Sequence, residues 1–166
     1  MFTVKKIVAM TAGAAALAIG CGSATAASSL SVQSVVPNSC AISAITPVSE
    51  GNYDPITSNA DKTGTATFKL KCTKNLTGIK VALSPGQSGD ASARYLQVGG
   101  TGDELPYSLT QDSAHMVNWG DTPASQYSAP TGTGLDQTIT IYYIIPGGQN
   151  IQAGTYTDTV SISATF

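Results

Sequence analysis

Residues 154–166, at the end of the sequence, alternate between apolar and small hydroxyl side chains. An alternation with a period of two over this length predicts a β-strand with one buried face. The sequence stops at this strand, so we expect no later strand of the chain to pair with its free edge, which an exported β protein must cover. We expect another chain to cover it, in an acceptor groove formed by the apolar residues Tyr156, Val160, Ile162, Ala164 and Phe166.

A second row of alternating side chains lies near the start of the chain. Residues 27–37 form a short segment that ends at Pro37, and proline cannot donate a hydrogen bond to a sheet ladder. We therefore expect an N-terminal extension that lends a strand to another molecule. Each molecule would then carry both an open edge and a strand to lend. The donor residues that we expect to face the groove are Leu30, Val32, Ser34 and Val36.

The first 26 residues have the pattern of a signal peptide. Lys5 and Lys6 precede an apolar run over residues 7–19, and an A-x-A cleavage site follows at residues 24–26. The run is shorter than the roughly 20 residues that a transmembrane helix needs, so we expect no direct membrane insertion after the leader is removed. An alternative interpretation makes Cys21 a lipid-attachment cysteine, although Ala18 stands where lipoproteins usually have leucine.

Composition favours an all-β exported protein. Only 11% of the residues are charged, whereas glycine, serine and threonine are abundant. Without Lys5 and Lys6, six basic residues remain against ten acidic ones, a net charge of −4. This charge argues against nucleic acid or an anionic membrane as a partner. We expect one domain at residues 38–166, no cofactor and no bound metal.

Two cysteines remain after the leader, and an even number in an exported chain favours a disulfide. Cys72 continues an inward row with Ala66, Phe68 and Leu70, which places its sulfur at the buried face of a strand. A metal site built on Cys40 and Cys72 would lack further ligands, because the chain has a single histidine. We predict a Cys40–Cys72 disulfide.

Six to eight short strands separated by turns describe a β-sandwich. The link at residues 74–77 predicts a hairpin between two of these strands, although loops of that length also connect strands that change sheet. The segment at residues 111–134 is the longest one without regular patterning. The expected strands cover residues 40–45, 65–73, 78–84, 94–98, 105–110, 138–145 and 154–166. The alternation places Ile79, Val81 and Leu83 on one face of the third, and Ile139, Ile141, Tyr143 and Ile145 on one face of the sixth.

Several segments, in order along the chain, together resemble the spore coat protein U domain, which occurs in subunits of archaic (Csu-type) chaperone-usher pili. The likeness runs from about Leu30 to Phe166. The segments are Gly51-Asn-Tyr-Asp-Pro55, Gly64-Thr-Ala-Thr-Phe-Lys-Leu-Lys-Cys72, Leu105-Pro-Tyr107, Trp119-Gly-Asp121, Ile145-Pro-Gly-Gly-Gln149 and Gly154-Thr-Tyr-Thr-Asp158.

The resemblance implies an incomplete immunoglobulin-like β-sandwich that lacks its last strand and is completed by a donor strand from another chain. It implies three partners: a periplasmic chaperone, an outer-membrane usher and neighbouring pilin subunits. It also implies export through the periplasm to a pilus on the cell surface, with a role in adhesion and biofilm formation. Ser34 departs from the apolar pattern of the family's donor residues. A single domain suits a shaft or adaptor subunit better than a two-domain tip adhesin.

Two other function classes remain as alternatives. One is a secreted structural protein of a spore or cyst coat. The other is a carbohydrate-binding module, in which Trp119 and Tyr127 stack on sugar rings while Asp121 binds hydroxyls; against this, a single tryptophan in a small sandwich is usually buried in the core. We do not expect an enzyme, because a lone histidine, His115, in a polar loop is no catalytic constellation.

Overall fold

The computed structural model describes residues 28–57, 59–100 and 102–166. The chain divides into two compact units, Met1–Val35 and Val36–Phe166. The expected signal peptide and Cys21 lie outside the described residues. In the first unit, residues 28–35 form neither helix nor strand. In the part of the chain that is described, no helix has the length and apolarity needed to cross a membrane.

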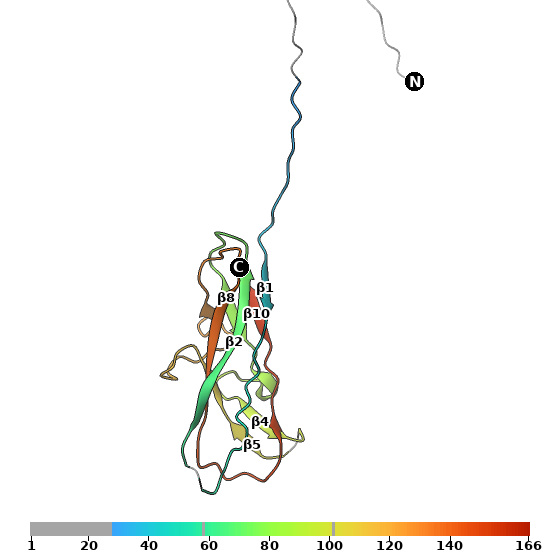
Figure 1. Ribbon diagram of the computed structural model, residues 1–166. Helices are drawn as coiled ribbons and strands as arrows, with labels where there is room; N and C mark the ends of the chain where they lie inside the picture. Colours follow the sequence, from blue (N-terminus) through green and yellow to red (C-terminus); the bar gives the residue numbers. More distant parts are fainter. Residues whose placement is uncertain (1–27, 58, 101) are drawn as a thin grey trace, which may run out of the picture. The chain divides into compact units, whose positions relative to one another are not determined.

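The second unit is all-β, with three antiparallel sheets (Figure 1). A four-stranded sheet has the order β1 (Cys40–Ser43), β2 (Lys62–Cys72), β8 (Gln137–Ile145) and β6 (Ser108–Thr110). A second sheet has the order β10 (Ile162–Thr165), β3 (Lys80–Leu83) and β7 (Tyr127–Ser128). A third, smaller sheet has the order β5 (Glu104–Pro106), β4 (Tyr95–Val98) and β9 (Tyr156–Thr157). The described helical structure is one short 3-10 turn, η1 (Gly86–Ser88).

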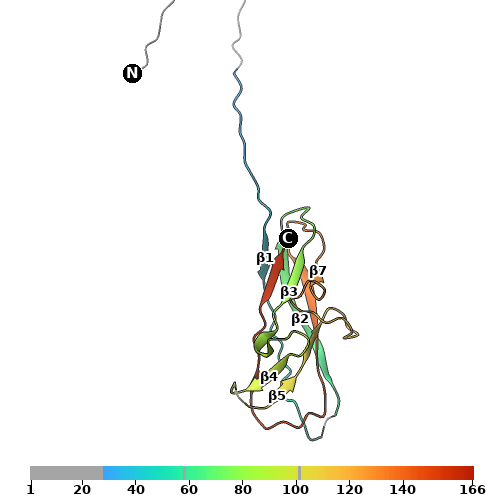
Figure 2. The same cartoon turned by 180° about the vertical axis from the view of Figure 1, so that it is seen from behind.

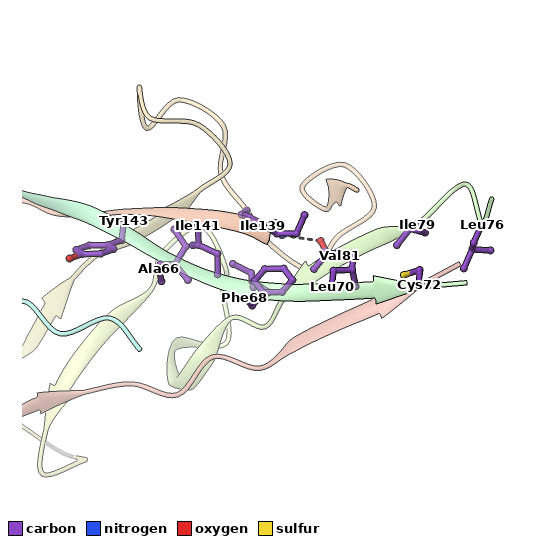
Figure 3. Packing of buried hydrophobic residues seen from close by; sticks show 13 residues of the cluster. Ala66, Phe68, Leu70, Cys72, Leu76, Ile79, Val81, Ile139, Ile141 and Tyr143 are labelled. Carbon is purple, nitrogen blue, oxygen red and sulfur yellow. Dashed lines mark hydrogen bonds between the residues drawn. The ribbon is translucent and has the colours of Figure 1, made fainter. Parts of the chain in front are cut away.

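The hydrophobic core is built from the inward rows that the alternation predicted (Figure 3). Side chains of β2 and β8 meet those of β3, and Trp119 packs among them. The predicted inward residues of these strands are all less than 10% exposed, which confirms the predicted faces. They are Ala66, Phe68, Leu70 and Cys72 on β2; Ile79, Val81 and Leu83 at β3; and Ile139, Ile141, Tyr143 and Ile145 on β8.

The expected hairpin between β2 and β3 is wrong. β2 pairs with β1 and β8, whereas β3 belongs to the second sheet, so residues 74–77 cross from one sheet to the other. Asn75 adopts a positive φ of 67°, and the buried side chain of Leu76 anchors the crossing. Residue 132 fixes the crossing on both sides, since Asn75 N donates to Gly132 O and Gly132 N donates to Leu76 O, each at 2.8 Å.

The alternation predicted one continuous strand at residues 154–166, but the structure divides it into two. The first is β9, which pairs with β4, and the second is β10, which pairs with β3. Asp158 lies at the break, where its carboxylate accepts hydrogen bonds from Gln87 N and from the hydroxyl of Tyr107. These contacts to distant segments replace the ladder at this point. The strand expected at residues 105–110 is divided in a similar way, into β5 and β6.

Candidate functional site: an open apolar groove

Strands β1 and β10 are the edges of two different sheets. β1 pairs only with β2, and β10 pairs only with β3, among the strands of the described residues. The two edge strands nevertheless lie side by side, as the two opposite views show (Figures 1 and 2). The outer backbone edge of β10 therefore has no ladder partner among the described strands, and such an edge can pair with a further strand.

A groove of about 1080 Å³ begins at this open edge. One wall is formed by residues 45–56, which follow β1, and the other by residues 151–162, which lead into β10. Apolar side chains from the sheets line its interior, so the groove opens directly onto the hydrophobic core. These side chains are Ala66, Leu83, Leu96, Leu105, Leu109, Ile141 and Ile145.

Most of the residues predicted for the acceptor groove lie at this site. Tyr156, Val160 and Ile162 line the groove and are partly buried. Ala164 is also partly buried and packs against the core, whereas Phe166 is 55% exposed. The intervening residues 157, 159, 161, 163 and 165 are exposed, so the alternation of faces persists across the break in the strand.

The wall at residues 45–56 was not predicted, because its glycine, asparagine and proline residues indicated only a turn. Its chain leaves the line of β1 at Ala44, which has a positive φ of 49°. Thr46 N donates to Thr67 O at 2.8 Å, and the hydroxyl of Tyr143 donates to Glu50. The hydroxyl of Tyr53 donates to Pro146 O at 2.8 Å. The wall is thus held by a few polar contacts rather than by a β-ladder.

The opposite wall is held by a polar network around Asp158. Tyr107 donates its hydroxyl to Asp158 Oδ2 at 2.6 Å, while Gln87 N and Thr159 N donate to Oδ1 at 2.9 and 2.7 Å. Burial, together with the hydrogen bond to Asp158, raises the pKa of Tyr107 well above its usual value. Gly86 has no room for a Cβ beside this carboxylate, which explains the glycine at that position.

The chain's single arginine, Arg94, is buried beside the end of β3 and the start of β4. It is 1% exposed, and its guanidinium donates to the carbonyl oxygens of Leu83, Ser84 and Ala91 at 2.8–3.1 Å. Burial lowers its pKa. The network therefore ties the end of β3 to β4. This role of Arg94 as a buried hydrogen-bond donor was not predicted, because the strand pattern around it does not distinguish a buried arginine from an exposed one.

The predicted disulfide is confirmed. Cys40 and Cys72 are directly opposite each other in the β1–β2 ladder, with an S–S distance of 2.05 Å and a Cα–Cα distance of 4.1 Å. The bond fastens the first residue of β1, which follows the N-terminal extension, to the neighbouring strand β2. Because β1 has no other strand partner among the described residues, the disulfide holds one border of the open edge in place.

Comparison with known proteins assigns a family to this arrangement. The family model described as the Spore Coat Protein U (SCPU) domain matches residues 26–163. The chain belongs to this family. Protein U of Myxococcus xanthus is 30% identical to it over 174 residues, and the alignment covers 96% of each chain. The family is one of structural proteins and not of enzymes.

Two solved structures are similar in fold. One is the CsuC–CsuE chaperone–tip adhesion subunit pre-assembly complex of archaic Csu pili from Acinetobacter baumannii, with 24% identity and a TM-score of 0.56. The other is a chaperone–tip adhesin complex of CFA/I fimbriae, with 14% identity and a TM-score of 0.50. They cover 79% and 76% of this chain, which in turn spans only 40% and 41% of the matched chains. At these identities the likeness shows the fold alone.

The predicted sugar-binding residues do not form an open platform in this SCPU domain. Trp119 is completely buried, donates from Nε1 to Val81 O at 2.9 Å, and packs against Phe68 and Tyr127 at centroid distances of 6.3 and 4.8 Å. The interpretation of Trp119 as a stacking residue is therefore wrong, and the core interpretation is confirmed. Tyr127 is partly buried on Trp119, whereas Asp121 is exposed.

The predicted donor residues of the SCPU domain are exposed and lie outside any strand. Leu30, Val32 and Val36 are 89%, 87% and 78% exposed, and Ser34 is also exposed. Val35, on the other face of the row, is 81% exposed. The segment therefore presents exposed apolar side chains on both faces of the row.

The remaining candidate residues for chemistry are metal ligands and the single histidine, His115. Within the described residues there is no group of three or more histidine, cysteine, aspartate or glutamate side chains that could hold a metal ion. His115 has a positive φ of 56°, and its Nδ1 lies 3.2 Å from the hydroxyl of Thr110. This contact holds the turn of the loop that contains His115.

Proposed function

We propose that this chain is a structural subunit of an archaic chaperone-usher pilus that polymerises by donor-strand complementation. Its domain is then an incomplete immunoglobulin-like sandwich, completed by a strand from another molecule. One observation carries the proposal: the apolar groove of about 1080 Å³ that lies between residues 45–56 and 151–162 and is bordered by the edge strands β1 and β10.

Strand addition suits both the backbone and the side chains of this groove. An added strand would form main-chain hydrogen bonds with the edge of β10 and insert alternate side chains into the apolar interior. The exposed row of Leu30, Val32 and Val36 has the required spacing. Burial of one leucine and two valines contributes about 1.5 to 3 kcal/mol each, before the cost of ordering the segment.

The partners follow from the same proposal. An empty apolar groove needs protection before assembly, and a periplasmic chaperone would supply it by lending its own strand. The usher and a neighbouring subunit would then exchange that strand for an N-terminal extension. The two solved structures described above are chaperone complexes of pilus proteins, which supports chaperone binding and a location at the cell surface.

A coat protein is the second candidate function. The family takes its description from a spore coat protein, and Protein U aligns along nearly the whole chain. Immunolabelling of the producing cells separates the two: labelled surface fibres support a pilus subunit, and a label confined to a spore or cyst coat supports a coat protein.

The proposal is tested by supplying the donor strand within the same chain. Residues 28–36 are fused after Phe166 through a short flexible linker, which makes strand addition intramolecular at an effective concentration in the millimolar range. The fusion is expected to melt at a higher temperature than the unfused chain. Val32→Asp in the added copy should remove most of this gain.

A matched control uses the same substitution on the other face of the donor. Val35→Asp in the added copy places its charge on the side that faces away from the groove, so most of the thermal gain should remain. If the fusion melts no higher than the unfused chain, or if both substitutions have equal effects, the groove does not take this strand and the donor-strand proposal fails.

A further inference from the structure

The two rows that would meet in the groove each contain one polar residue. The donor row reads Leu30, Val32, Ser34, Val36. The acceptor row is apolar at Tyr156, Val160, Ile162 and Ala164 and polar at Asp158, which also lines the groove. We infer that the occupant of the groove is the N-terminal extension of a second copy of this chain, in the antiparallel register that sets Ser34 opposite Asp158. This inference rests on the proposed function and adds the partner and the register to it.

Only one antiparallel register matches the two polar residues. It sets Leu30 opposite Ile162, Val32 opposite Val160 and Val36 opposite Tyr156, so that every apolar donor side chain meets an apolar one. A shift by two residues sets Val36 opposite Asp158 and Ser34 opposite Val160, two mismatches that each bury a polar group against an apolar side chain. An odd shift would turn the whole donor row away from the groove.

A shift by two residues in the other direction sets Val32 opposite Asp158 and Ser34 opposite Tyr156, which is again two mismatches. A shift by four residues in the first direction is opposed by the disulfide-bonded part of the chain. It would bring Asn38 opposite Asp158 and thereby draw residues 37–38 into the foreign groove. The next residue, Ser39, is fastened to its own domain, since its backbone N donates to Thr73 Oγ1 at 2.9 Å, and Cys40 is bonded to Cys72. Pro37 would also remove a donor from the new ladder.

The hydrogen-bonding capacity of Asp158 fits a serine at this position. Its Oδ1 accepts from two backbone N–H groups, whereas Oδ2 accepts only from Tyr107 among the described contacts. A carboxylate oxygen can accept two hydrogen bonds, so Oδ2 has one acceptor site left. Directly opposite residues of an antiparallel pair have Cβ atoms about 4.5 to 5.5 Å apart, which brings a serine hydroxyl within reach of that oxygen. An occupant with an apolar residue here would bury the remaining acceptor unpaired.

The same chain cannot supply this strand to itself. Val36 lies four residues before Cys40, and four extended residues reach about 14 Å. Cys40 is in β1, beside β10, whereas Tyr156 belongs to the third sheet, whose strands β4 and β5 lie toward the opposite end of the second unit (Figure 1). The six residues from Tyr156 to Ile162 alone span about 20 Å. A Val36–Tyr156 pair therefore requires two molecules.

Paired cysteine substitutions test the register in the full chain, exported together with its chaperone and usher in a bacterial expression host. The variant Val32→Cys/Val160→Cys joins residues that the inference places opposite each other. Two matched controls, Val32→Cys/Ile162→Cys and Ser34→Cys/Val160→Cys, join residues that are two positions out of register. Non-reducing gels of the secreted chain should show a ladder of covalent multimers for the first variant and mainly monomer for both controls.

The outcomes separate the inference from the proposed function. A ladder from a control variant but not from Val32→Cys/Val160→Cys overturns the register and leaves strand lending in place. The absence of a ladder from all three variants, with the Cys40–Cys72 disulfide intact by mass spectrometry, overturns the inference that a second copy is the occupant. The thermal gain of the fusion then decides independently whether the groove accepts a donor strand at all.

Discussion

Tyr107 and Asp158 lie 51 residues apart in the sequence and are joined by a hydrogen bond of 2.6 Å from the tyrosine hydroxyl to Oδ2. This bond links the segment between β5 and β6 to the segment between β9 and β10, at the points where each expected strand is divided between two sheets. The pair thus lies where the final strand leaves the third sheet and becomes a wall of the groove.

The first prediction concerns the Tyr107 hydroxyl. Tyr107→Phe should lower the free energy of unfolding by about 1 to 3 kcal/mol, because Asp158 loses a hydrogen-bond donor in a partly buried position. Urea denaturation measures the change. Tyr95→Phe is a matched control, since no hydrogen bond of its hydroxyl is found within the described residues. Equal stability of Tyr107→Phe and wild type would contradict a structural role for the bond.

The second prediction is an alkaline loss of stability. Burial and Asp158 raise the pKa of Tyr107 in the folded protein above the value of about 10 for an unfolded tyrosine. Folding thus favours the neutral form of Tyr107. The contribution of this form to the free energy of unfolding is fully present below about pH 10 and is lost as pH rises above that value. Melting temperatures from pH 8 to 11 should fall less steeply in Tyr107→Phe than in wild type. Parallel curves would refute the coupling.

The alternating rows were sufficient to predict the core and one wall of the groove, but not the break in that wall or the wall opposite. Phe68, Ile141 and Val81 were predicted to face inward because local periodicity reports which face of a strand is buried. The break at Asp158 depends instead on contacts with Tyr107 and Gln87, which no local pattern contains.

A hairpin was expected at residues 74–77 for a similar reason. A loop of that length suits a hairpin and a crossing between sheets equally well, and only the pairing partners of the two strands distinguish them. The wall at residues 45–56 looks like a turn in sequence because its polar contacts reach Thr67, Pro146 and Tyr143, which are distant along the chain. The donor row and the acceptor row at residues 156–166 could both be read from the sequence, whereas the wall that faces the acceptor row could not.

The third prediction concerns the disulfide. The double variant Cys40→Ser/Cys72→Ser should lower the free energy of unfolding by about 2 to 5 kcal/mol, because the bond closes a loop over a sequence separation of 32 residues. The double substitution avoids a free thiol. Thiol labelling of the denatured, unreduced secreted chain should detect no free cysteine at either position, whereas two labelled thiols would contradict the bond.

The fourth prediction uses the single tryptophan as a probe. Trp119 is completely buried, so its fluorescence in the native protein should resist quenching by acrylamide and become accessible on unfolding. Trp119→Phe should lower the free energy of unfolding by at least about 1 to 3 kcal/mol, because the buried carbonyl of Val81 loses its indole donor. Quenching of the native protein as efficient as that of free tryptophan would show that the side chain is exposed and reopen the sugar-stacking interpretation.

The fifth prediction tests the face of β10 that borders the groove. Ile162 is partly buried there and lines the groove, whereas its neighbour Ser163 is exposed on the other face of the strand. Ile162→Asp places a carboxylate against apolar side chains and should prevent capture of the exported chain by its chaperone, because burying that charge on strand addition costs several kcal/mol. Ser163→Asp introduces the same charge on the solvent side and should leave capture unchanged. Co-purification of each variant with the chaperone measures the difference. Normal yield of the complex with Ile162→Asp would mean that the chaperone binds elsewhere and that this face of β10 is not the acceptor surface.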